Sequence, residues 1–109
     1  MHFYVDVDGT LCNTSGLDYE NATPIQSRID KVNQLYEYGH TITVYTARGS
    51  RSSLRNYIKE LTAKQLREWG VKYTYLSVGE KPVYDYLIDD RNICLDQLDS
   101  DYLNEHFCR

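Results

Sequence analysis

The chain has 109 residues, of which 41% are hydrophobic, so it can bury the core of one domain and has no room for a second. Its formal net charge of −4 argues against a dedicated surface for nucleic acid or anionic membranes, and no run approaches the roughly 18 apolar residues of a membrane span. Three cysteines without CxxC spacing favour neither a disulfide framework nor a zinc site. Because the N-terminus also lacks a secretory pattern, we expect a cytoplasmic protein.

Strand and helix signals alternate along the chain. Strands are predicted at residues 3–8, 40–46, 71–78 and 84–88. Helices are predicted at residues 24–38, at about 52–69 and within 95–107, the first with Thr23 as N-cap and Pro24 at its first position. The alternation predicts βαβ units, and so one three-layer α/β/α domain over residues 1–109 with a mainly parallel, Rossmann-like sheet and helices on both faces.

The first predicted strand ends in two carboxylates at a glycine turn. Because side chains alternate along a strand, Asp6 and Asp8 fall on the same face. Water, a proton or a divalent cation must relieve their repulsion, and Mg²⁺ suits oxygen ligands of this kind. Asp8 followed by Gly9 is also a common turn, but a buried, unpaired Asp6 on an apolar strand would be costly, which favours catalysis.

Polar residues also follow the other predicted strands. Thr46 ends the second strand, Lys81 follows the third, and Asp89 and Asp90 end the fourth. Ligands of open α/β sheets bind beyond the carboxyl ends of the strands, so these side chains are expected to meet the first-strand carboxylates there. The simpler interpretations are a β-forming threonine, a solvated loop lysine and an N-cap pair of acids.

Taken together in this order, the motifs resemble those of the magnesium-dependent phosphatases of the haloacid dehalogenase superfamily. The resemblance extends from Phe3 to Arg91 and rests on Asp6-Val7-Asp8-Gly9-Thr10, Thr46, Lys81 and Asp89-Asp90. The gaps between the motifs have no room for a cap domain, so the chain resembles a small capless member. The resemblance implies that such a site is left open to large substrates or is completed by a neighbouring subunit of a homo-oligomer.

The resemblance also implies a role for each motif residue. Asp6 would attack phosphorus and form an aspartyl-phosphate, and Asp8 would act as general acid and then as general base. The phosphate would be bound by Thr46, Ala47, Arg48 and Lys81. The Mg²⁺ ion would be held by Asp6, Asp8, Asp89 and Asp90. For Arg48, an exposed cluster with Arg51 and Arg55 at a helix start is the competing interpretation.

These roles predict a Mg²⁺-dependent phosphomonoester hydrolase acting on a sugar phosphate or another small phosphomonoester, with no membrane or nucleic-acid partner. A phosphotransferase would use the same intermediate and pass the phosphate to an acceptor other than water. The motifs are also compatible with a nucleotide or polynucleotide phosphatase of the same fold, and with a catalytically silent binding protein.

Overall fold

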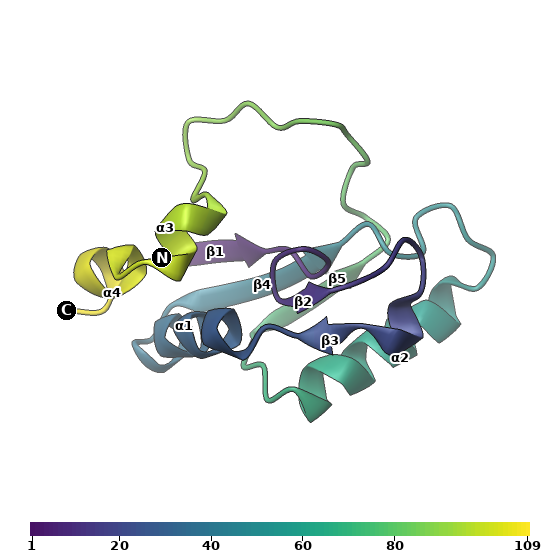
Figure 1. Ribbon diagram of the computed structural model, residues 1–109, viewed down its shortest axis with the longest axis horizontal. Coiled ribbons are helices and arrows are strands. Elements are labelled where there is room, and N and C mark those ends of the chain that lie inside the picture. Colours follow the sequence, from purple (N-terminus) through teal and green to yellow (C-terminus); the bar gives the residue numbers. More distant parts are fainter.

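A three-stranded parallel sheet forms the centre of the computed structural model, in the order β1–β4–β5 (Figure 1). β1 covers His2–Val5, β4 Thr41–Thr46 and β5 Tyr75–Val78. The crossovers contain α1 (Gln26–Glu37) and α2 (Arg55–Glu68). Val5 pairs with Val44 and Thr46 pairs with Val78, so the carboxyl ends of the strands lie at one edge. The predicted α/β class and the parallel, Rossmann-like sheet are therefore confirmed.

A small flap follows β1, formed by residues 12–24. Its two short strands, β2 (Cys12–Asn13) and β3 (Thr23–Pro24), pair antiparallel around a 3-10 turn at Tyr19–Asn21. The prediction that Thr23 and Pro24 begin the first helix is wrong, because α1 starts only at Gln26. Proline lacks an N–H group and is tolerated in an edge strand as well as in a first helical turn. Here Thr23 and Pro24 form a strand because β2 pairs with them.

The tail forms two short helices, α3 (Leu95–Asp99) and α4 (Tyr102–Phe107), where a single final helix was predicted. The break lies at Ser100, whose backbone is extended and whose hydroxyl accepts a hydrogen bond from the backbone N–H of Tyr102 at 3.1 Å. Serine competes well for backbone groups in this way. None of the α-helices combines the length and the apolar character needed to cross a membrane.

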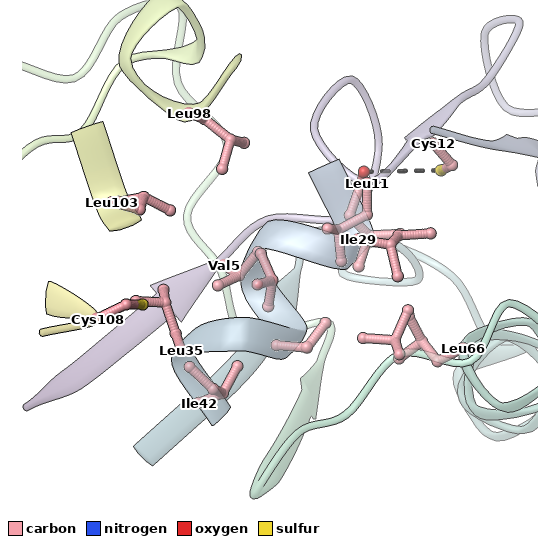
Figure 2. Packing of buried hydrophobic residues seen from close by; sticks show 14 residues of the cluster. Val5, Leu11, Cys12, Ile29, Leu35, Ile42, Leu66, Leu98, Leu103 and Cys108 are labelled. Carbon is pink, nitrogen blue, oxygen red and sulfur yellow. Dashed lines mark hydrogen bonds between the residues drawn. The ribbon is translucent and has the colours of Figure 1, made fainter. Parts of the chain in front are cut away.

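The hydrophobic core lies on one face of the sheet. Figure 2 shows Val5 and Ile42 of the strands packed with Leu35 of α1, and Leu66 of α2 lies in the same cluster. On the opposite face, Tyr4 and Tyr75 remain 62% and 60% exposed. The second helical layer expected from the alternation is therefore not formed. The chain contains no helix between β5 and α3 to supply it.

The fourth strand predicted at residues 84–88 is also wrong in this structure. The chain between β5 and α3 forms neither helix nor strand, and Figure 1 shows it as a long green arch. Tyr86 and Ile88 are 91% and 99% exposed. Alternating apolar residues form a strand only where another strand accepts their backbone hydrogen bonds, and here β1 keeps a free edge.

Candidate active site

A pocket of about 760 Å³ opens at the carboxyl ends of the three parallel strands. Its base contains side chains from the segments that follow each strand, namely Asp6, Asp8, Thr46, Ala47, Arg48 and Lys81. Residues of the flap and of the start of α2 form its walls. The location agrees with the rule that ligands of open α/β sheets bind beyond the strand ends.

The turn after β1 holds the two first-strand carboxylates at this pocket. Val7 between them is fully buried, and its carbonyl accepts the N–H groups of Thr10 and Leu11 at 3.2 and 2.9 Å. Gly9 has a φ of +79°, a conformation that L side chains rarely adopt. The tight turn therefore requires glycine at this position, and it keeps both carboxylates at the base of the pocket.

Asp6 is paired with Lys81. The Lys81 Nζ atom lies 3.1 Å from Asp6 Oδ1, and the side chains of Lys81 and Asp6 are 12% and 29% exposed. Burial raises the pKa of Asp6, while the ammonium group of Lys81 and its hydrogen bond oppose that rise. Burial also acts to lower the pKa of Lys81, but the Asp6 charge outweighs it and raises that pKa. The pair therefore favours an ionised Asp6 beside a cation.

Asp8 is held by a two-pronged hydrogen bond from Arg48. Arg48 Nη2 donates to Asp8 Oδ1 at 2.8 Å, and Arg48 Nε donates to Oδ2 at 2.9 Å. The Thr14 hydroxyl of the flap donates to Oδ1 at 2.6 Å. Burial by itself would raise the pKa of Asp8, but the hydrogen bonds from Arg48 and Thr14 lower it below its ordinary value. These hydrogen bonds therefore fix the orientation of the Asp8 carboxylate and favour its ionised form.

Arg48 is buried, with 1% of its surface exposed, and every N–H group of its guanidinium is engaged. Nη1 donates to Thr62 Oγ1 at 3.2 Å and to Gln65 Oε1 at 2.6 Å, and Nη2 reaches Cys12 Sγ at 3.8 Å in addition to Asp8. A guanidinium has five N–H donors, so none is left for a phosphate. The predicted phosphate-binding role of Arg48 is therefore not supported, and neither is an exposed cluster with Arg51 and Arg55.

Sequence reasoning missed the partners of Arg48 on α2. Thr62 lies within the continuous helix α2, and its hydroxyl donates to the carbonyl of Ile58 at 2.8 Å. Gln65 Nε2 donates to the carbonyl of Tyr19 at 2.6 Å, which ties the flap to α2. The sequence did contain one signal for these partners. Thr62 and Gln65 are polar, lie three residues apart, and share the buried face of α2 with Leu66.

Thr46 lies at the end of β4 and is 1% exposed. Its Oγ1 accepts the backbone N–H of Arg48 at 3.1 Å, so its own hydrogen is free to be donated toward the pocket. Ala47 forms the next part of the floor and contributes only backbone atoms and a methyl group. Both residues lie where the sequence analysis expected them.

Asp89 and Asp90 do not join the first-strand carboxylates. Both are exposed on the arch, and Asp89 Oδ1 accepts the backbone N–H of Arg91 at 3.1 Å. Three or more His, Cys, Asp or Glu side chains do not gather anywhere in the molecule in a way that would hold a metal ion. The expected four-carboxylate metal site is therefore not assembled, because the strand that was to carry Asp89 and Asp90 to the sheet edge is missing.

Comparison with known proteins supports the fold and the class of chemistry. The sequence model for haloacid dehalogenase-like hydrolases matches residues 3–73. No curated protein matches the chain. A crystal structure of a protein from Vibrio cholerae superposes with a TM-score of 0.82 and 26% sequence identity, over 95% of this chain and 91% of that one. The matched segment includes Asp6, Asp8 and Thr46 and ends before Lys81.

Proposed function

Because this chain belongs to the haloacid dehalogenase-like hydrolases, we propose that it hydrolyses phosphomonoesters in the pocket that contains Asp6 and Asp8. The proposal rests on one observation above all. An aspartate at the end of β1 lies 3.1 Å from the ammonium group of Lys81 and opens into the same pocket as the Thr46 hydroxyl. A nucleophile, a cation and a hydrogen-bond donor are thus available to one phosphoryl group.

Asp6 is the proposed nucleophile. One of its carboxylate oxygens forms a bond to phosphorus while the bond from phosphorus to the alcohol oxygen breaks, which leaves an aspartyl-phosphate. Water then attacks phosphorus and releases inorganic phosphate and the free carboxylate. Lys81 supports this role because it favours the ionised carboxylate and neutralises charge on the phosphoryl oxygens, to which Thr46 donates a hydrogen bond.

Asp8 is the proposed proton carrier. The leaving alcohol needs a proton, and the attacking water must later lose one, so a single carboxyl group serves both half-reactions. The hydrogen bonds from Arg48 and Thr14 favour the ionised Asp8, which is the form that accepts a proton from water in the second half-reaction. For the first half-reaction Asp8 takes a proton from the monoanionic phosphate group of the incoming substrate and passes it to the leaving alcohol oxygen. We propose Arg48 as a positioning residue that orients Asp8 and does not itself contact the phosphate.

Mg²⁺ is the proposed cofactor. The pocket contains the carboxylates of Asp6 and Asp8, which together with water and a substrate phosphate oxygen would fit the preference of this ion. Asp6 and Asp8 would hold it, while Asp89 and Asp90 do not reach the pocket in this arrangement. When bound, the ion would neutralise charge on the phosphoryl oxygens.

The test of the proposed function is the Asp6→Asn variant. We expect the wild type to hydrolyse p-nitrophenyl phosphate in the presence of Mg²⁺, and Asp6→Asn to lower kcat by a factor on the order of 10³ or more, because asparagine is not a nucleophile. Asp30→Asn is the matched control, since Asp30 is exposed on α1 and does not line the pocket. Wild-type protein without phosphatase activity, or an Asp6→Asn variant with full activity, would contradict the proposal.

A further inference from the structure

The outer wall of the catalytic pocket, which we define as Leu17, Leu54, Tyr57 and Val83, is apolar and exposed. These side chains are 82%, 61%, 51% and 61% exposed, respectively. They come from three separate segments: the flap, the start of α2 and the stretch after Lys81. Single exposed apolar residues are ordinary, but a group of them around one opening marks a surface that binds something apolar.

Three polar side chains beside the outer wall each have a partner within the protein. The Asp18 carboxylate accepts the Asn21 amide at 3.0 and 3.1 Å, the Glu20 carboxylate accepts the Tyr57 hydroxyl, and Ser52 Oγ accepts the backbone N–H of Leu54 at 2.9 Å. A sugar would bring four or more hydroxyl groups that lose water on binding. Leu17, Leu54 and Val83 offer no hydrogen-bonding side-chain group, so a sugar hydroxyl that lost its water against them would weaken binding.

The charged side chains beside the outer wall favour an uncharged leaving group on the substrate. Asp18 and Glu20 bring two negative charges, and Arg51 brings one positive charge without a hydrogen bond inside the protein. A second phosphate or carboxylate on the substrate would meet two carboxylates for each guanidinium. The pocket of about 760 Å³ is also much larger than a phosphoryl group, so most of its volume is available to the leaving group.

From these observations we propose that the substrate is a phosphomonoester of an uncharged, largely apolar alcohol, whose carbon skeleton contacts the outer wall while its phosphate lies at Asp6. This inference rests on the proposed function and narrows its substrate class. It departs from the sugar phosphate expected from the sequence, because the four residues of the outer wall present apolar carbon atoms to the leaving group.

A matched pair of substrates tests the proposal. Cyclohexylmethyl phosphate and glucose 6-phosphate each carry the phosphate on a CH₂ group attached to a six-membered ring, and they differ mainly in the ring hydroxyls. We expect kcat/KM to be at least about 10-fold higher for cyclohexylmethyl phosphate. Glucose is the better leaving group of the two alcohols, so intrinsic reactivity alone would favour glucose 6-phosphate. A preference for cyclohexylmethyl phosphate must therefore come from the enzyme. An equal or higher kcat/KM for glucose 6-phosphate would overturn the proposal.

A variant assigns the preference to the wall. Leu54→Ala removes apolar surface at an exposed position, so we expect the ratio of the two kcat/KM values to fall about 10-fold, mainly through KM for cyclohexylmethyl phosphate. Leu95→Ala is the matched control, because Leu95 is a 40% exposed leucine at the start of α3, outside this pocket. An unchanged ratio in Leu54→Ala would contradict the assignment.

The two proposals fail in different ways. If neither cyclohexylmethyl phosphate, glucose 6-phosphate nor p-nitrophenyl phosphate is hydrolysed, the proposed function is wrong, and the inference fails with it. If hydrolysis occurs and is lost in Asp6→Asn, but the sugar phosphate is preferred, only the inference about the leaving group is wrong.

Discussion

The base of the pocket and the arch of residues 79–94 both carry paired acidic motifs, and the structure treats them in opposite ways. Asp6 and Asp8 are each paired with a cation from another segment of the chain, Lys81 and Arg48. On the arch, Asp89 and its neighbour Asp90 are exposed, and Asp89 accepts a hydrogen bond only from the adjacent backbone N–H of Arg91. The difference shows that a motif becomes a site only where other elements supply its partners.

The same comparison explains why the apolar residues of β1 form a strand and those of residues 84–88 do not. Val5 lies on a strand whose neighbour β4 accepts its hydrogen bonds and whose inner face is covered by α1. Ile88 has no neighbouring strand and is 99% exposed. Neither burial nor hydrogen bonding then compensates for the entropy lost when a strand becomes ordered.

Amide hydrogen exchange is expected to show the largest contrast between the two regions. The backbone N–H groups of residues 84–88 make no hydrogen bond within the protein, while those of β4 lie in the middle of the sheet. We expect the arch to exchange at least about 10³-fold faster than β4. Strong protection of residues 84–88, with or without added Mg²⁺, would show instead that this segment pairs with the free edge of β1.

Replacing one acid in each region tests how much the pairing contributes to stability. Asp8→Asn leaves the buried guanidinium of Arg48 without a counter-charge, so we expect the free energy of unfolding to fall by about 3 kcal/mol. Asp89→Asn removes an exposed charge, and we expect no measurable change. Urea unfolding measures the free energy of unfolding of both variants. Equal stability of Asp8→Asn and Asp89→Asn would contradict the prediction.

Replacing Lys81 tests the charge balance at the nucleophile. Burial raises the pKa of Asp6 and Lys81 opposes that rise, so Lys81→Met should raise the pKa further. The acid limb of kcat/KM, where Asp6 becomes protonated, should therefore move to higher pH. Lys64→Met serves as the control, because Lys64 is 62% exposed on α2 and makes only a long ion pair of 3.9 Å with Glu68. A limb that moves in both variants or in neither contradicts this role for Lys81.

The smallest expected effect is the dependence of stability on acid. The folded-state pKa of Asp8 lies below its ordinary value of 3.8, so the contribution of Asp8 is complete above that value and is lost as the pH falls through the lower folded pKa. The raised pKa of Asp6 acts in the opposite direction and offsets part of the loss. The stability gap between wild type and Asp8→Asn should therefore shrink on acidification. A gap that stays constant with pH would mean that the carboxylate charge contributes nothing.

Much of the fold and half of the site were predictable from residue patterns. The parallel order of β1, β4 and β5 follows from helices that separate strands, and the positions of Asp6, Thr46 and Lys81 follow from their places just beyond strand ends. The role of Arg48 was not predictable, because its partners Thr62 and Gln65 are 14 and 17 residues away and make no recognisable motif with it.

The sequence alone determined the family, the parallel sheet and the carboxylate pair at its edge, because these depend on local periodicity and on the order of short motifs and elements along the chain. Only the tertiary structure decided which cation each acid meets, that residues 84–88 stay outside the sheet, and that the wall of the pocket is apolar. Those outcomes depend on which distant groups compete for the same partner, and that competition is settled by packing in three dimensions.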